Sequence, residues 1–483
     1  MKTKIFLYVF LSNAIICFAQ QNNSSLSQSE QTILQALDAQ SQQYASIAQQ
    51  IWDWAELGYL EEKSSNLLQT TLAKEGFKIE KGVADIPTAF IASYGSGQPV
   101  IALMGEFDAL PGVSQDRVPF KQERSEVNAG HACGHHLFGT GSAAAAIAVK
   151  NWLQSSGKKG TIRFYGTPAE EGGAGKVYMV RAGLFDDVDV VLHWHPGSSN
   201  SAAATSSLAN KSAKFRFHGI ASHAAVSPQN GRSALDGVEA MNMMVNMMRE
   251  HIPSEARIHY VITRGGEAPN VVPAEAEVFY YVRHPEMAQV RTIFERVAKA
   301  AEGAALGTGT TMDYEVIHGV YNLLPNETIS EVVNAKLQLV GGVNYNEEEK
   351  TFGQQILKSY GADHLDVSMA ADIAPYYVNN RGAGGSTDVG DVSWAVPTAG
   401  LRTATWVPGT SPHSWQAVAA GGTSIGVKGM MVAAKTLALS AIELFENPTL
   451  TQTALEELNR KRGKDFKYKA LLGDRKPPLD YRK

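Results

Sequence analysis

The amino-acid sequence predicts an α/β domain, a mixed sheet flanked by helices, that is interrupted by a smaller α+β domain of ferredoxin-like order. Three observations predict this division. The chain has 483 residues, of which 44% are hydrophobic, which is enough for two separate cores. Short β-rich runs alternate with helical stretches before residue 210 and again after residue 323. Between residues 211 and 322 the order is instead strand, helix, strand, strand, helix, strand.

The first 19 residues have the pattern of a cleaved secretion signal. Lys2 and Lys4 precede an apolar run from Ile5 to Ile16, and small residues near Cys17 fit a cleavage site. The run is short for a bilayer span, although an uncleaved membrane anchor is the alternative. We therefore expect an exported protein, periplasmic or secreted, that has no membrane anchor.

The charge balance offers no general attraction to nucleic acid, so we expect no nucleic-acid partner. The formal net charge is −5, and loss of Lys2 and Lys4 with the signal leaves −7. The mature chain keeps a single cysteine, Cys133, and therefore forms no internal disulfide. A lone thiol in an oxidising compartment needs protection, which metal coordination would provide.

Residues 27–210 are expected to form the first part of the α/β domain. Ser27 and Glu30 make a capping-box pattern, and apolar residues from Tyr44 to Trp54 follow at helical spacing, which predicts one long amphipathic helix. Strands are expected in the runs TAFIASYG, VIALMGEF, TIRFYGT and VDVVLHWHP. Helices are expected in the alanine-rich run after Gly141 and in GKVYMVRAGLF. Open sheets of this type bind their ligands beyond the strand ends.

Residues 211–322 are expected to form the inserted domain. Its strands are the runs SAKFRFHG, ARIHYVITRGG, AEVFYYVRH and TTMDYEVIHG, and its helices span residues 232–250 and 285–305. Five methionines between residues 241 and 248 are expected to pack in a core or an interface rather than line a ligand groove. The α/β pattern resumes in residues 323–450. The basic residues 451–483 are expected to be a solvated tail.

Two pairs of potential metal-binding or catalytic residues follow predicted strands. Cys133 and His135 lie two residues apart in a glycine-flanked loop, a spacing that lets a thiolate and an imidazole face one cation. Glu170 and Glu171 are adjacent in the run TPAEEGG. Adjacent carboxylates allow one to bind metal while the other moves protons.

Further imidazoles come from the runs HWHP, which contains His193 and His195, and SPHSW, which contains His413. Any one of these residues alone fits a surface loop or a hydrogen-bonded core histidine. The ordered set of thiolate, imidazoles and carboxylates at several strand ends instead predicts one or two metal sites.

The motifs that carry these residues resemble, in order, those of the metal-dependent peptidase and amidohydrolase family that contains aminoacylases, carboxypeptidase G, hippurate hydrolases and auxin-conjugate hydrolases. They are GEFDALPG, GHACGHHLFGTG, TPAEEGG, WHPG, GIASHAAVSPQNGRSALDG, EAPNVVPAEAEVFYYVR, GSTDVGDVSW and SPHSWQ. The resemblance covers nearly the whole mature chain. It implies a two-metal catalytic domain with an inserted four-stranded domain that serves as a lid and dimerises.

The resemblance also assigns roles to individual residues. The implied metal ligands are Cys133, His135, Glu171, His195 and His413. Glu170 is implied to be the general base, and Asp108 to orient a metal-binding histidine. In the inserted domain, His223 is implied to stabilise the oxyanion in the partner's site, and Asn270 and Arg283 to bind the substrate's amide and carboxylate.

Some assignments remain open at this stage. His193 is the alternative ligand to His195, and the resemblance favours His195 because it matches the family position. Arg283 also fits a salt-bridged strand residue. His136 replaces the usual Asn or Asp, so it is an extra ligand, an orienting group or neutral variation. Two residues before Asp108 stands Glu106, where many relatives have a histidine ligand.

The expected function is that of an exported, dimeric enzyme that cleaves N-acyl or N-aroyl amino acids, with compounds like aminobenzoyl-glutamate as leading substrates. The alternatives are a dipeptidase or carboxypeptidase and, in another class, a metal-free binding protein on the same scaffold. Two divalent metals are expected per subunit. Thiolate and imidazole favour zinc, whereas the resemblance suggests manganese. The partner subunit is expected to be a second copy of the chain or a paralogous subunit.

Overall fold

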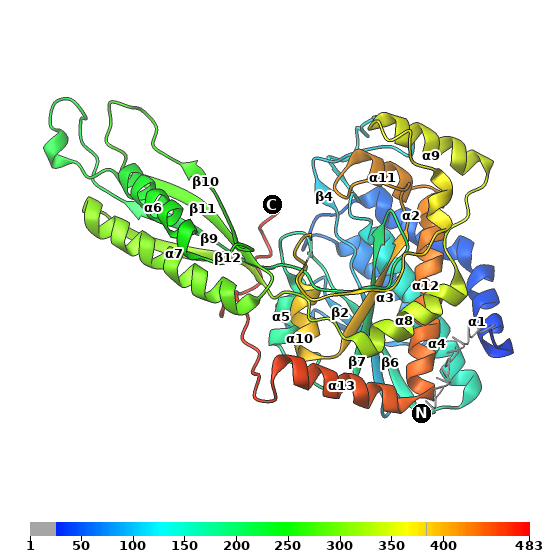
Figure 1. Cartoon of the computed structure of the whole chain (residues 1–483). Coiled ribbons are helices and arrows are strands. Elements are labelled where there is room, and N and C mark those ends of the chain that lie inside the picture. Colours follow the sequence, from blue (N-terminus) through cyan, green and yellow to red (C-terminus); the bar gives the residue numbers. More distant parts are fainter. Residues whose placement is uncertain (1–25, 383) are drawn as a thin grey trace, which may run out of the picture.

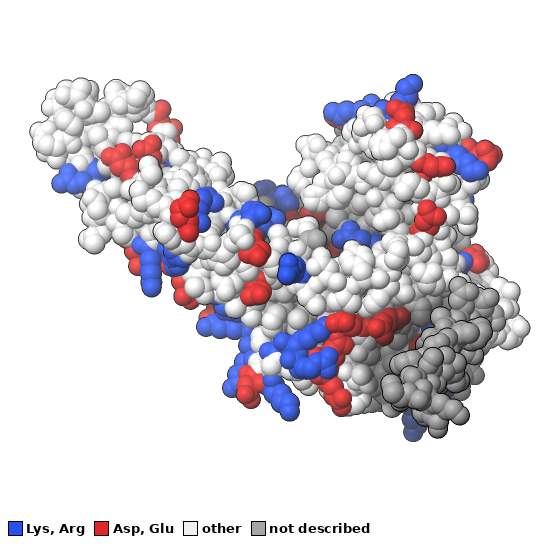
Figure 2. Space-filling view, viewed as in Figure 1, with Lys and Arg blue, Asp and Glu red and all other residues white. Residues whose placement is uncertain are grey.

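The computed structural model describes residues 26–382 and 384–483, and the expected signal at residues 1–19 lies outside them. The chain forms a main domain and a smaller lid, residues 209–320, that extends away from it (Figure 1). Figure 2, in the same view, shows a notch between the main domain and the lid. Basic and acidic side chains are interspersed over this surface.

A six-stranded mixed sheet in the order β1-β2-β6-β3-β7-β14 forms the centre of the main domain. The four strands from β6 to β14 run parallel, while β1 and β2 are antiparallel to their neighbours. The strands are β1 (Lys78–Lys81), β2 (Phe90–Ser96), β3 (Val100–Gly105), β6 (Gly160–Gly166), β7 (Val190–Gly197) and β14 (Thr398–Ala404). Two short pairs join β4 (Leu110–Pro111) to β5 (Ala129–Gly130) and β8 (Ala204–Thr205) to β13 (Val378–Asn379).

Helices cover both faces of this sheet, as the predicted alternation requires. One face packs against α1 (Gln28–Ala39), α2 (Ser41–Trp54), α3 (Glu62–Lys74), α4 (His135–Ser156), α8 (Glu327–Val340) and α12 (Ser424–Glu446). The other face packs against α5 (Gly175–Arg181) and α10 (Val389–Ala395). The remaining helices are α9 (Glu347–Ser359), α11 (Trp415–Gly421) and α13 (Pro448–Arg462), with short 3₁₀ turns η1 (Val83–Asp85) and η4 (Val367–Ala371).

Within the described ranges, α12 alone is long and apolar enough to cross a membrane, but 83% of its most apolar stretch is buried inside the protein. Its contacts with α4 and α8 make it a core helix of the main domain.

The lid has the predicted ferredoxin-like order. Its antiparallel sheet runs β10-β11-β9-β12, and both long helices pack on one face of it. The elements are β9 (Ala209–His218), α6 (Ala234–Met248), β10 (Arg257–Arg264), β11 (Glu275–His284), α7 (Met287–Thr308) and β12 (Thr311–Val320), with η2 (Pro228–Asn230) and η3 (Arg249–His251). Of the five methionines, Met241 and Met248 enter the core, whereas Met243, Met244 and Met247 are exposed.

The first helix differs from its prediction. The capping box of Ser27 and Glu30 is present, but the helix ends after Ala39 and α2 begins at Ser41. Gln40 between them leaves helical geometry, and its side-chain carbonyl accepts a hydrogen bond from Tyr44 Oη at 2.6 Å. Apolar spacing continues across the break, so the pattern alone shows a single helix.

The expected solvated tail is also corrected by the structure. Residues 451–462 belong to α13, and residues 463–483, which we call the C-terminal strap, pack against the main domain and the base of the lid. Ala470, Leu471 and Leu472 of the strap are buried. These apolar residues anchor the strap despite the basic residues around them.

Candidate metal centre

Cys133 and His135 lie in the turn that leads into α4, and His135 is the first residue of that helix. Gly134 between them has φ +76°, and a Cβ at this position would lie 2.6 Å from Cβ of Pro196. Only glycine therefore lets the turn pack this closely on β7. As a result, Cys133 Sγ lies 3.5 Å from Nε2 of His195.

Two imidazoles have one ring nitrogen fixed and the other directed into the site. The Nδ1–H of His135 donates to Asp108 Oδ1 at 2.8 Å, and the Nδ1–H of His195 donates to the Pro196 carbonyl at 2.7 Å. Each bond leaves a lone pair on Nε2, the atom that can bind metal. His193 packs instead against Gly400 of β14. Of the two β7 histidines, the structure thus brings His195 to the other expected ligands.

Glu170 and Glu171 lie in a turn after β6 that two buried carboxylates hold. Ala169 has φ +57°, a conformation that residues with a Cβ rarely adopt. Its N–H donates to Glu61 Oε1 at 2.8 Å, and the N–H of Glu171 donates to Asp108 Oδ2 at 2.9 Å. Asp108 therefore holds a histidine with one oxygen and this turn with the other.

His413 reaches the site from the loop before α11. It has φ +60°, and its backbone N–H donates to the Ala132 carbonyl at 3.0 Å. Its Nε2 lies 3.1 Å from Glu171 Oε1. A left-handed histidine is strained, and such strain persists where the surrounding structure fixes the residue, commonly at functional sites.

The donor atoms form three overlapping groups, and within each group the atoms lie within 4.8 Å of one another. The groups are Cys133, His135 and His195; Cys133, Glu171 and His413; and Glu106, His135 and Glu170. The first two contain all five expected ligands and share Cys133. The expected base, Glu170, lies in the third.

Several donor atoms are buried close together without forming hydrogen bonds to one another, as expected for metal ligands. Glu106 Oε2 and His135 Nε2 are 3.0 Å apart, yet neither has an aligned hydrogen-bond partner among the described residues. Glu171 Oε1 also lacks one within the described ranges. Buried polar atoms without partners are costly, and a cation would use their lone pairs. Thiolate, imidazole and carboxylate together suit a divalent transition metal.

Burial favours the neutral forms of Glu170, Cys133 and His195. It raises the pKa of Glu170 well above its usual range, and nearby Glu106 and Glu171 raise it further. Burial also raises the pKa of Cys133 to about 12 and lowers the pKa of His195 to about 3. A bound cation favours thiolate and carboxylate, so it would reverse these preferences for the acids.

A buried lysine balances the acidic side of the site. Lys176 Nζ on α5 lies 2.6 Å from Glu106 Oε1 and 2.7 Å from Asp388 Oδ1, and each of these side chains is at most 1% exposed. Although burial opposes ionisation, the Lys176 ammonium and His135 hold the pKa of Glu106 below its usual range. The carboxylate of Glu106 is therefore fixed between an ammonium and the metal-binding side of His135.

The lid residues lie in two different places. His223 and Asn270 are in the exposed loops beyond β9 and β10, at the end of the lid away from the main domain (Figure 1). These loops pair with each other, since Ala224 N–H donates to the Asn270 carbonyl at 3.0 Å. The structure therefore does not bring His223 or Asn270 to the donor groups of the same chain.

Arg283 lies near the base of the lid, toward the end of β11. Its guanidinium is 5.4 Å from the ring of Tyr281, and its buried Nε has no hydrogen-bond partner among the described residues. The salt bridge that a purely structural role of Arg283 would predict is not found among the described residues.

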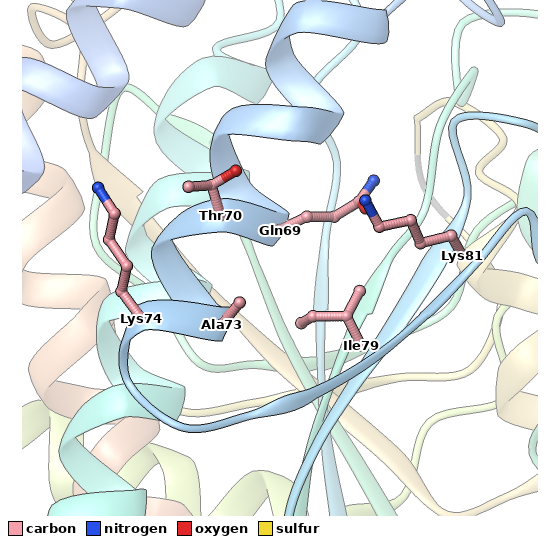
Figure 3. Close-up of a pocket in the computed structure, with 6 residues that line it drawn as sticks. All are labelled: Gln69, Thr70, Ala73, Lys74, Ile79 and Lys81. Carbon is pink, nitrogen blue, oxygen red and sulfur yellow. The ribbon is translucent and has the colours of Figure 1, made fainter.

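A hollow of 360 Å³ elsewhere on the main domain, between α3 and β1, carries no comparable chemistry (Figure 3). Its lining residues are Gln69, Thr70, Ala73, Lys74, Ile79 and Lys81. None of them belongs to the donor groups.

Comparison with known proteins agrees with this chemistry. The model of Peptidase family M20/M25/M40 matches residues 102–410, more than half of the chain. The chain belongs to peptidase family M20/M25/M40. The predicted family, the α/β fold with its flanking helices and the class of metal-dependent amidohydrolase or peptidase are thereby confirmed.

Similar proteins of this family include enzymes of two kinds. The B-type subunit of p-aminobenzoyl-glutamate hydrolase of Escherichia coli is 45% identical over 448 residues, which cover 87% of this chain and 93% of that protein. Xaa-Arg dipeptidase of Mus musculus is 28% identical over 440 residues, which cover 88% and 91%.

Solved structures of the M20 family share the fold. The aminobenzoyl-glutamate utilization protein from Klebsiella pneumoniae aligns with a TM-score of 0.60 at 19% identity, covering 86% of this chain and 98% of that one. A dinuclear metal-binding peptidase of the M20 family from Bacillus subtilis aligns with a TM-score of 0.57 at 18% identity, covering 85% and 99%.

His136 does not join the donor groups of this M20 chain. Its Nε2–H donates to the Gly421 carbonyl at 3.0 Å, and its ring centre lies 4.8 Å from that of His131. His131 donates likewise to the Ile51 carbonyl at 3.1 Å. Both histidines therefore tie the metal-binding loop to neighbouring helices, and the structure gives no support to His136 as an extra ligand.

The sequence analysis did not identify Glu61, Lys176 and Asp388, which surround the M20 site. Two of them had a visible signal. Lys176 interrupts the apolar run of α5, and Asp388 lies in the motif GSTDVGDVSW. A buried lysine requires a carboxylate partner. The sequence does not say which carboxylate, because 212 residues separate these two.

Proposed function

We propose that the chain cleaves the amide bond of N-acyl or N-aroyl amino acids with two divalent cations, and that p-aminobenzoyl-glutamate is its leading substrate. The observation that carries this proposal is the pair of donor groups that share Cys133, with Glu170 beside them. The substrate class is supported by the relative at 45% identity, the B-type subunit of p-aminobenzoyl-glutamate hydrolase.

Each of the two proposed cations would be held by one donor group. One group consists of Cys133, His135 and His195, and the other of Cys133, Glu171 and His413. Bound divalent cations lower the pKa of water toward neutrality and polarise the amide carbonyl. Glu170 takes a proton from the attacking water and returns it to the nitrogen of the leaving amine. Burial and the neighbouring Glu106 and Glu171 carboxylates raise the pKa of Glu170, which favours its acceptance of a proton from water.

The lid completes the proposed site from a second subunit. A histidine at the far end of the lid can donate to the developing oxyanion of a partner's site, as we propose for His223. Asn270 lies in the adjoining loop and would hold the amide from the same end of the lid. Arg283 lies at the other end of the lid, near its base, so it would not enter the partner's site together with them; its guanidinium suits the substrate carboxylate. The partner is a second copy of the chain or a paralogous subunit, since a relative of the A type is also similar to this chain.

We further propose that the cations are manganese or zinc and that the protein is exported after loss of residues 1–19. Metal analysis of the purified chain distinguishes the two metals. A processed N-terminus in the periplasm or medium tests the export.

The substrate proposal is tested by comparing p-aminobenzoyl-glutamate with a dipeptide that ends in arginine, the type of substrate named by the Xaa-Arg dipeptidase relatives. We expect a higher kcat/KM for the aroyl-glutamate. A preference for the dipeptide would instead assign a dipeptidase activity.

The catalytic roles are tested by two substitutions of adjacent residues. We expect Glu170→Gln to abolish turnover while metal content stays at the wild-type level, and Glu171→Ala to lose metal. Equal metal loss in both variants would show that the two roles are wrongly divided.

A further inference from the structure

The C-terminal strap connects the lid, the main domain and the turn that contains the catalytic glutamates. Figure 1 shows the last part of the chain running upward between the two bodies to the end marked C. Arg475 Nη1 of the strap donates to the carbonyl of Val316 on β12 at 2.9 Å. Arg181 Nη1 on α5 donates to the carbonyls of Gly473 and Arg475, both at 2.8 Å. The strap is thus held on both sides of the domain junction.

Beyond these anchors the strap reaches the turn itself. Arg482 Nη2 donates to the backbone carbonyl of Glu171 at 2.7 Å, and Tyr481 Oη donates to the same carbonyl at 3.2 Å. The Tyr481 ring packs edge-on against Tyr59 at 5.6 Å. Tyr59 Oη in turn donates to the Gly173 carbonyl at 2.8 Å. Two residues from the strap and one from the loop before α3 therefore hold one side of the turn.

The backbone of the turn depends on outside partners. Its N–H groups at Ala169 and Glu171 donate to Glu61 and Asp108, while the Glu171 carbonyl accepts from the strap. Glu171 Oε1 has no aligned hydrogen-bond partner among the described residues and lies 3.1 Å from His413 Nε2, so the backbone contributes strongly to where this carboxylate points. Bonds from a guanidinium are stronger than neutral ones. Arg482 is consequently the firmest of the contacts to this carbonyl.

We propose that Tyr481 and Arg482 are positioning residues that hold Glu171 in the orientation needed to bind metal. This role rests on the proposed function, because it assumes that Glu171 is a ligand. It makes the strap a part of the site although both residues bind the backbone carbonyl of Glu171 and not its carboxylate. Groups that orient ligands from outside commonly change metal affinity by about 10- to 100-fold when removed.

The test uses the full chain with three substitutions and one control. Arg482→Ala removes the charged donor, Arg482→Lys keeps a cation, and Tyr481→Phe removes only a hydroxyl. Lys483→Ala is the control, because this neighbouring side chain is exposed. The dissociation constants for Mn²⁺ and Zn²⁺ are measured by competition with a chelator, and hydrogen exchange of the turn amides is measured in the metal-free protein.

We expect Arg482→Ala to weaken metal binding by about 10- to 100-fold and to speed amide exchange in the turn. Tyr481→Phe should weaken binding by about 2- to 10-fold, the usual effect of one neutral hydrogen bond. Arg482→Lys should recover part of the loss, and Lys483→Ala should match the wild type. Tyr481→Phe keeps the ring contact with Tyr59, so it remains informative if Arg482→Ala fails to fold.

Unchanged metal affinity in both Arg482→Ala and Tyr481→Phe would overturn the positioning role. The same holds if the variants lower thermal stability but bind metal like the wild type, since the strap would then be only structural. A wild-type chain that binds no divalent cation would overturn the proposed function itself, which separates the two failures.

Discussion

Replacing Lys176 with methionine should destabilise the metal-free protein far more than an ordinary loss of an ion pair. Lys176 is fully buried and contacts two carboxylates, Glu106 at 2.6 Å and Asp388 at 2.7 Å. Its backbone N–H also donates to Asp388 Oδ2 at 3.0 Å, so Asp388 stays in place when the ammonium is lost. Methionine replaces most of the aliphatic part of the side chain but leaves Asp388 buried without the ammonium and Glu106 with only His135 beside it.

Breaking a buried pair by removing one partner costs about 3–5 kcal/mol. With two carboxylates left behind, we expect Lys176→Met to lose an amount near the upper end of that range. The matched control is Lys150→Met, which removes a buried ammonium with one partner, Glu75, at 3.0 Å. The Glu75 carboxylate is 33% exposed, so water replaces the lost contact, and we expect a loss of about 1 kcal/mol or less.

The assay is urea unfolding of the chelator-treated chain, repeated with metal bound. The double variant Lys176→Met with Asp388→Asn should regain part of the loss, because one uncompensated charge is removed. Bound cations should also reduce the loss, because they supply positive charge beside Glu106. A loss below about 1 kcal/mol in the metal-free protein, equal to that of Lys150→Met, would refute the assigned role of Lys176.

Three further results are expected. Cys133→Ser should weaken the retention of metal against a chelator, because a hydroxyl is a poorer ligand than a thiolate; unchanged retention would contradict the shared thiolate. On the lid, hydrogen bonds to Asp313 and Glu275 raise the pKa of His218. Protonated His218 therefore stabilises the folded state fully below pH 6.5, and this contribution is lost as the pH rises through the folded-state pKa. His218→Gln should therefore flatten the fall in stability above pH 6.5 in urea unfolding, by less than about 1 kcal/mol since these groups are exposed. Co-expression of His223→Ala with Glu170→Ala should restore activity to about a quarter of all sites, as expected for random pairing in a two-fold dimer; no recovery in demonstrated mixed dimers would exclude a shared site.

The elements of both domains could be predicted because their signals are local. Strand runs and helical spacing depend on residues a few positions apart, and the βαββαβ order of the lid follows from six such segments. The ligand motifs were also readable, since each one is short and lies at a strand end. His195 could be preferred over His193 only because it matches the family position, since residues two apart on a strand share a face. In the structure His193 packs against Gly400, whereas His195 lies beside Cys133.

Features that depend on distant contacts could not be predicted. Arg482 lies 311 residues from the carbonyl that it binds, and no local pattern indicates such a pair. Its basic surroundings suggested a solvated tail, whereas the three buried residues from Ala470 to Leu472 fix the strap to the protein. The break at Gln40 was not predicted because it is too local: it depends on the backbone conformation of one residue within an otherwise continuous apolar pattern.

The placement of the site residues separates metal binding from turnover. Every atom of the two donor groups belongs to the main domain, as do the groups that orient them. His223 and Asn270, in contrast, lie at the far end of the lid. A single chain can therefore assemble the proposed cation sites alone, while the proposed stabilisation of the oxyanion by His223 would need a second lid. It follows that a variant unable to dimerise should keep its metal and lose kcat, whereas loss of the strap's contacts should weaken metal binding with the dimer intact.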